Sequence, residues 1–139
     1  KEVYLISDGY KKTELTGENG IYFMTSGSSS EPKIIKKSIS NLLCEAKDLA
    51  RKFNIDKNSI FVSTTVPAHM FGLTFHVMLP LELGCSIDTD RILYPEDLKS
   101  YENYILISTP SFLDKMYKYD RKFDTPPKLI ISAGSKLKD

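Results

Sequence analysis

The sequence predicts an α/β fold: a layered, mostly parallel sheet with flanking helices. Two observations support this prediction. Short apolar runs alternate along the chain with longer segments of helical periodicity. The runs are continuously apolar and are bounded by turn residues, which is typical of strands covered on both faces in parallel sheets. In a layered fold, the helices between the strands provide that cover.

Six segments are predicted to be strands: residues 3–6, 21–24, 59–64, 85–87, 104–108 and 128–132. The clearest helix covers residues 41–53, where apolar side chains recur at helical spacing and Ser40 is placed to accept a first-turn amide. A second helix, residues 71–83, is apolar on almost every side and stops at Gly84, which indicates a buried connector. A third, residues 110–119, begins with Pro110, whose missing N–H does no harm in a first turn.

Composition and charge exclude several classes of protein. The chain has 139 residues, enough for one domain with a sizeable core, and its 41% hydrophobic and 27% charged residues are typical of globular proteins. Nineteen basic residues against eighteen acidic ones leave a formal charge of +1, so no global field favours nucleic acid or an anionic membrane. We therefore expect no nucleic-acid partner and anion binding at a local site only. The cluster Lys33, Lys36 and Lys37 is short, and its last two lysines fit the solvated end of a strand.

No stretch approaches the roughly 18 apolar residues that a membrane span needs, and the N-terminus lacks a signal-peptide pattern. Cys44 and Cys85 form no C-x-x-C pair, which argues against a zinc site or a disulfide framework and favours reduced thiols. These features lead us to expect a cytoplasmic location and no metal site within the chain. The first residue is not Met, so we expect the chain to begin partway through a longer protein.

A hydroxyl-rich loop, residues 25–33, directly follows the predicted strand 21–24. Small residues let backbone amides approach phosphate oxygens, hydroxyls add donors, and a lysine supplies positive charge. The loop therefore has the chemistry of a polyphosphate cradle. Its candidate phosphate-binding residues are Thr25, Ser26, Gly27, Ser28, Ser29 and Lys33.

Two other interpretations of this loop remain open. A P-loop of the G-x-x-x-x-G-K-[ST] type fits the spacing from Gly27 to Lys33, but Pro32 replaces the second glycine and Ile34 the final hydroxyl residue. A simple Ser-rich connection between two hairpin strands also fits the composition.

The loop closely resembles the phosphate-binding loop of the adenylate-forming superfamily, T-S-G-S-T-G-x-P-K. Six positions match outright, Ser29 replaces Thr conservatively, and Asn41-Leu42 stands at the family's distance from the loop. Ser30 replaces a usual glycine, which adds strain if that position needs positive φ.

Two further segments resemble the family in order and spacing. Residues 66–73 resemble its P-x-x-H-x-x-G-L segment, which implies that His69, Phe71 and Gly72 border an acyl-substrate pocket. Residues 132–137 resemble its adenosine-side turn, which implies a role there for Ala133, Gly134 and Ser135. Both segments also have simpler interpretations. His69 can be a helix-start or core histidine, and Phe71, Phe75 and Met78 can form an apolar core stripe. Residues 133–135 can be a plain strand-to-helix turn.

The resemblance implies one partial AMP-binding domain over residues 1–139, from an acid–thiol ligase of the acyl-CoA synthetase kind. Such ligases join a carboxylic acid to ATP with Mg²⁺, release pyrophosphate, and pass the acyl group to CoA or a carrier-protein thiol. The family's metal-binding glutamate, ribose-binding aspartate and catalytic lysine have no counterpart here. We therefore assign no catalytic residue and expect the chain alone to be inactive.

A rival prediction from another class is a non-catalytic phosphate-binding or interaction module built on the same scaffold. Ser30 favours it, and continuation of the parent reading frame into the missing motifs would favour the enzyme. If flanking strands are absent, exposed apolar edges lead us to expect self-association.

Overall fold

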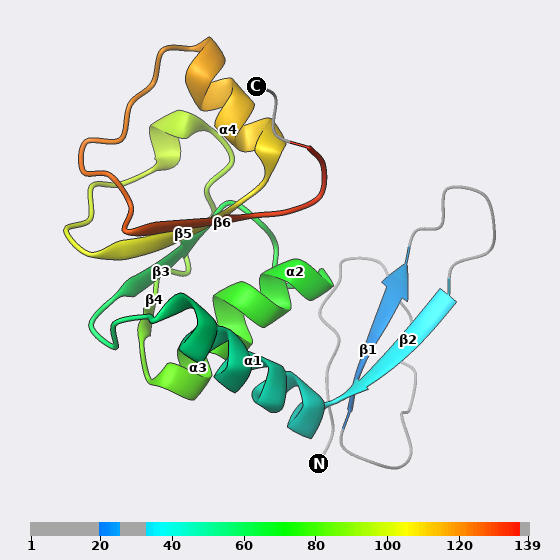
Figure 1. The fold of residues 1–139 in the computed structure, drawn as a ribbon. Coiled ribbons are helices and arrows are strands. Elements are labelled where there is room, and N and C mark those ends of the chain that lie inside the picture. The colour runs from blue at the N-terminus through cyan, green and yellow to red at the C-terminus, as the bar shows by residue number, and fades with distance from the viewer. Residues whose placement is uncertain (1–19, 26–32, 137–139) are drawn as a thin grey trace.

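The computed structural model describes residues 20–25 and 33–136, which form two sheets and their flanking helices (Figure 1). The larger sheet is parallel and has the strand order β4-β3-β5-β6. Its strands are β3 (Ile60–Ser63), β4 (Ser86–Ile87), β5 (Tyr104–Ser108) and β6 (Leu129–Ser132). The prediction of an α/β fold with a mostly parallel sheet is confirmed. The predicted strand 3–6 lies outside the described residues.

A separate antiparallel hairpin contains β1 (Gly20–Thr25) and β2 (Lys33–Ser38), with Ile21 opposite Lys37 and Met24 opposite Ile34. The expectation that the run 21–24 is a strand of the parallel sheet is therefore wrong. The connection between β1 and β2, residues 26–32, is far shorter than the dozen or so residues that a parallel crossover needs. A short connection forces the two strands to run antiparallel.

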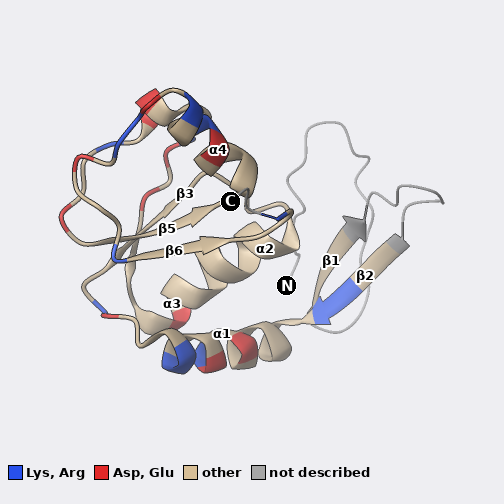
Figure 2. Ribbon diagram, turned by 45° about the horizontal axis from the view of Figure 1, so that its top comes forward, with Lys and Arg blue, Asp and Glu red and all other residues tan. Residues whose placement is uncertain are grey.

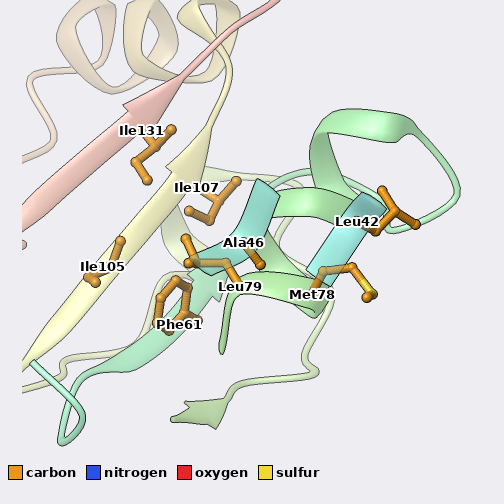
Figure 3. Close-up of a cluster of buried hydrophobic side chains, with 8 residues drawn as sticks. All are labelled: Leu42, Ala46, Phe61, Met78, Leu79, Ile105, Ile107 and Ile131. Atoms are coloured by element: carbon orange, nitrogen blue, oxygen red, sulfur yellow. The ribbon is translucent and has the colours of Figure 1, made fainter. Parts of the chain in front are cut away.

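Four helical segments cover one face of the parallel sheet. They are α1 (Ile39–Phe53), α2 (Met70–Gly72), the π-helical turn η1 (Leu73–Met78) and α3 (Leu79–Leu83). Between this layer and the sheet lies a buried cluster, drawn in Figure 3: Leu42, Ala46, Phe61, Met78, Leu79, Ile105, Ile107 and Ile131. Phe71 and Phe75 pack against it, as expected for a core stripe.

The opposite face is covered by α4 (Pro110–Lys118) and the short 3-10 helix η2 (Pro95–Asp97). The second buried cluster lies here: Val62, Ile92, Tyr104, Leu106, Phe112 and Met116. Neighbouring strand residues point to opposite faces, so Phe61 enters the first cluster and Val62 the second. The continuously apolar strands are thus explained by cover on both sides.

Helix α1 begins two residues earlier than the sequence pattern predicts. Its N-cap is Ser38, whose Oγ accepts a hydrogen bond from the Asn41 N–H at 3.1 Å. The expectation that Ser40 caps the helix is wrong, because Ser40 already lies in the first helical turn and its hydroxyl lies 3.0 Å from that of Ser38. The cap is therefore the last residue of β2, and hairpin and helix share one boundary.

The helix predicted over residues 71–83 exists and ends as predicted, with Gly84 in the left-handed region at φ 69°. Its middle turn, η1, is wider than an α-helix, and the Leu79 N–H bonds to the Thr74 carbonyl five residues back. Pro80 explains this turn, because its ring would clash with the carbonyl four residues back and it has no N–H to donate. Within residues 20–25 and 33–136, no helix is both long and apolar enough to cross a bilayer.

Candidate site at the carboxyl edge of the parallel sheet

The two central strands send their following segments to opposite faces of the sheet. After β3 the chain continues into α2, η1 and α3 on one face, whereas after β5 it enters α4 on the other face (Figures 1 and 2). Because β3 and β5 are neighbours, their carboxyl ends form a topological switch point. Open α/β sheets bind their ligands in the crevice at such a point. The carboxyl edge between β3 and β5 is therefore our candidate site.

Three hydroxyl residues form a row across this edge. The register aligns Ser108 of β5 with Ser132 of β6, and the Thr64 N–H donates to the Ile107 carbonyl at 2.9 Å, which aligns Thr64 with Ser108. The Thr64 and Ser108 hydroxyls are hydrogen-bonded to each other at 3.0 Å. The Ser132 Oγ is buried and has no hydrogen-bond partner in the structure. We call Thr64, Ser108 and Ser132 the hydroxyl row.

A tight turn fixes the chain where it leaves β3. The Ser63 Oγ accepts the Thr65 N–H at 3.0 Å and lies 2.8 Å from the Thr65 hydroxyl. These short-range bonds direct the following segment, residues 64–69, away from the sheet and into α2.

His69 and Phe71 occupy different environments at the start of the second helical layer. His69 is exposed, serves as the N-cap of α2, and its carbonyl accepts the Leu73 N–H at 2.9 Å. Phe71 is half-buried and contacts Phe75, with ring centroids 5.1 Å apart. Of these two predicted acyl-pocket residues, the structure exposes the first and packs the second partly into the core.

Gly72 is buried because the chain passes directly over it. A Cβ placed on Gly72 would lie 2.2 Å from the Val66 carbonyl oxygen and 3.2 Å from the Pro67 Cα. Glycine thus allows the segment leaving β3 to fold back across α2. This close approach gives Gly72 a packing role that does not depend on substrate.

The predicted adenosine-side residues Ala133, Gly134 and Ser135 directly follow β6 and are exposed. Gly134 has φ 114°, a conformation that side chains disfavour, and a Cβ there would meet nothing within 4 Å. The carboxyl ends of parallel strands lie at one edge, so this turn and the segment that leads to His69 belong to the same edge of the sheet.

Most of the predicted phosphate loop lies outside the described residues, namely Ser26, Gly27, Ser28 and Ser29. The structure does describe the strand ends, where Thr25 is opposite Lys33 at the open end of the hairpin. Figures 1 and 2 both place the hairpin beyond α2, on the side toward which the parallel strands point. All three predicted segments are thus attached to elements on that side of the molecule.

A polar network lies at the carboxyl end of β4, the outermost strand of the parallel sheet. The His76 Nε2 donates to the Asp88 carbonyl at 3.0 Å. Its Nδ1 is buried and has no hydrogen-bond partner in the structure. Burial lowers the pKa of His76. Tyr101 donates a short hydrogen bond to the Asp88 carboxylate, which lowers the pKa of Asp88. This network fastens the β4–β5 connection to η1.

Among the described residues, no three His, Cys, Asp or Glu side chains converge where they could hold a metal ion. Cys44 and Cys85 are free thiols, and burial raises the pKa of Cys85. The described part of the chain therefore offers hydroxyls and backbone groups, rather than a metal centre, at its candidate site.

Sequence analysis did not single out the hydroxyl row as functional. The signal was nevertheless present, because the predicted strands 59–64, 104–108 and 128–132 all end in a hydroxyl residue. A polar residue at the carboxyl end of an apolar strand marks the edge where an α/β sheet binds ligands.

A comparison with solved structures finds a similar fold in part of a larger enzyme. One of the matching structures is O-succinylbenzoate coenzyme A synthetase (MenE) from Bacillus subtilis, in complex with AMP. The TM-score is 0.67 at 14% sequence identity, and the match covers 81% of this chain and 24% of MenE. The chain thus spans about a quarter of the length of that enzyme. No protein-family model matches the sequence.

Proposed function

We propose that the chain is part of the large domain of an ATP-dependent acid–thiol ligase, in which it binds ATP phosphates and borders the acyl substrate. The hydroxyl row at the switch point is the observation that supports this proposal most directly. It lies at the one sheet edge to which both the His69 segment and the turn at Gly134 belong. The likeness to MenE, whose structure contains AMP, supports the same class of reaction.

In the proposed reaction, the carboxylate oxygen of an acid attacks the α-phosphorus of ATP, pyrophosphate leaves, and an acyl-adenylate forms. A thiol of CoA or of a carrier protein then attacks the acyl carbon and releases AMP. The loop from Thr25 to Lys33 would hold the β- and γ-phosphates, with Lys33 offsetting their charge. The mixed set of amides, hydroxyls and one lysine suits positioning and charge neutralisation, which dominate this kind of substitution.

Calorimetric titration of the chain with Mg-ATP tests the proposed phosphate contacts. We expect binding that Lys33→Ala weakens by about tenfold, since a charge-assisted contact to phosphate contributes roughly 1.4 kcal/mol or more. Lys57→Ala is the matched control. Lys57 is exposed in the turn before β3, and its substitution removes the same charge at a position outside the loop. Equal weakening by both variants, or no binding of Mg-ATP, would contradict the proposed role of the loop.

The alternative of a non-catalytic binding module is favoured by Ser30, which stands where the resembled loop has glycine. Both proposals predict no carboxylate-dependent pyrophosphate release from this chain alone. The two proposals differ for the parent protein, which releases pyrophosphate in the presence of a carboxylic acid only if it is a ligase. Release from the parent that Lys33→Ala abolishes would support the ligase, and nucleotide binding without release would support the module.

A further inference from the structure

Three segments without charged side chains meet at the candidate site. Residues 59–81, 103–113 and 129–135 contain no Asp, Glu, Lys or Arg, although these four residue types make up 27% of the chain. The segments contain β3, β5 and β6 and the residues that follow these strands at the carboxyl edge. Figure 2 accordingly shows the three strands and α2 without blue or red. We call the parts that follow the strands the neutral edge: residues 64–71, 109–113 and 133–135.

Burial explains why the strands lack charge, because charged side chains are almost never fully buried without a partner. It does not explain the neutral edge. Residues 66–69 and 133–135 are exposed, and Val66 is 42% exposed. Met70 and Phe71 follow as half-buried side chains that pack against the first buried cluster. The exposed part of the switch point therefore consists of apolar side chains, hydroxyls, a glycine and one histidine.

The three parts of the neutral edge converge on the crevice between β3 and β5. The hydroxyls of Thr64 and Ser108 are hydrogen-bonded at 3.0 Å, and Ser132 is aligned with Ser108 in the sheet. The Val66 carbonyl lies directly over Gly72, so the segment after β3 stays close to α2. A ligand bound in this crevice would lie against uncharged groups from all three strands.

The first charged residues beyond the three segments and beyond β4 belong to other contacts or other segments. Asp88 and Asp90, which follow β4, both form ion pairs with Lys99. Glu82 pairs with Lys47 at 3.6 Å. Asp114 lies in α4, and Lys136 follows the turn at Gly134. None of these residues belongs to residues 64–71, the segment that borders the acyl group in the proposed function.

A second charge on the acyl group would lose its hydration at this edge without an opposite charge to replace the water, which is unfavourable. We infer that the acid carries no charge other than the carboxylate that reacts, and that its acyl group is apolar where it meets residues 66–71. The inference rests on the proposed function, since it concerns the acid used in that reaction. It excludes free amino acids and dicarboxylic acids as substrates.

Calorimetric titration of the chain with three acyl-sulfamoyl-adenosines tests the inference. These compounds mimic an acyl-adenylate, share the same adenosine, and differ only at the far end of the acyl group. The first has an octanoyl group, the second the same group with a terminal amine, and the third the same group with a terminal carboxylate. At about pH 8, where an ordinary histidine is uncharged, the octanoyl compound should bind about tenfold more tightly than either charged compound.

A charge introduced on the neutral edge should change this preference. Val66→Asp alters an exposed side chain and should weaken octanoyl binding while strengthening binding of the terminal amine, each by roughly three- to tenfold. Val66→Asn adds polarity without charge and should leave the order of the three compounds unchanged. Leu81→Asp places the same charge on a 64% exposed side chain of α3, at the other end of the helical layer from α2 (Figure 1), and is the matched control.

The outcomes separate the inference from the proposed function. Equal binding of the three compounds, tighter binding of a charged one, or binding of Mg-ATP but of none of the three would overturn the inference alone. Failure of both Mg-ATP and the three compounds to bind would overturn the proposed function and the inference with it. A preference for the octanoyl compound that Val66→Asp reverses and Leu81→Asp preserves would support an uncharged acyl group.

Discussion

The Val66 carbonyl oxygen stands where a side chain on Gly72 would have to be, 2.2 Å from the position of an ideal Cβ. The nearest obstacle is backbone rather than a flexible side chain, so it cannot move without shifting the segment that leaves β3. The close approach of these two backbone segments packs α2 against the segment that leaves the switch point.

Gly72→Ala is therefore expected to destabilise the protein, although alanine favours a helix over glycine by about 1 kcal/mol. Overpacking against backbone costs more than this gain, and we expect a net loss of roughly 1–3 kcal/mol in the free energy of unfolding. Urea unfolding measures it. A variant as stable as the parent would show that the segment carrying Val66 relaxes freely.

Stability should depend on pH through His76. Its pKa is lowered in the folded state by burial, so below about pH 6.5 the unfolded chain binds more protons than the folded chain. The free energy of unfolding should fall as pH drops from 6.5 toward the folded-state pKa of His76, with a slope of at most about 1.4 kcal/mol per pH unit. Urea midpoints measured across this range should lose that slope in His76→Gln and keep it in His69→Gln, which alters an exposed histidine.

The capping of α1 gives a paired test. Ser38→Ala removes the acceptor of the Asn41 N–H and should cost about 1 kcal/mol of stability. Ser40→Ala changes a residue inside the first turn and should have a smaller effect or none. Chemical unfolding of the two variants compares them directly, and a larger loss for Ser40→Ala would restore the sequence-based assignment of the cap.

The bond from Tyr101 to Asp88 should also be pH-dependent. Tyr101→Phe removes a hydrogen bond to a carboxylate and should cost about 1.5–3 kcal/mol near neutral pH. The pKa of Asp88 is lowered in the folded state, so this stabilisation is present above the ordinary aspartate value of 3.8 and is lost as pH falls through the folded-state pKa.

Tyr104→Phe is the natural control for that experiment. The Tyr104 hydroxyl donates to the neutral Thr125 carbonyl at 3.0 Å, and burial raises the pKa of Tyr104 to about 12. Loss of this hydrogen bond should therefore lower the free energy of unfolding by the same amount at neutral and acid pH. If the two variants respond to acid alike, the Asp88 carboxylate is not the source of the effect.

The parallel layer could be predicted from the sequence because its signals are local. The strand 104–108 and the helix that stops at Gly84 are recognisable from continuous apolar runs and from one glycine. The run 21–24 was grouped with the strands of the parallel sheet, because such a run is apolar whether its partner is parallel or antiparallel. The alternative interpretation of two hairpin strands agrees with the antiparallel pairing of β1 and β2. The wide turn η1 was not expected, although Pro80 signals a break in the helical ladder.

The candidate site could be predicted only in part. The segments containing His69 and Gly134 were found by resemblance, and the structure attaches both to one edge of the sheet. The hydroxyl row depends on register between strands, since Thr64 meets a partner 44 residues further along the chain. Periodicity within a strand contains no information about such a pairing.

The strand order also determines how the protein must fold. The chain forms α2, η1, α3, β4 and η2 between β3 and β5, although β3 and β5 are neighbours in the sheet. Ile60 therefore pairs with Tyr104 across this long intervening segment. Loop closure of this length loses chain entropy before the contacts compensate for it, so the centre of the sheet should form late and slowly. Its amides should then exchange with solvent deuterium only when the whole domain opens.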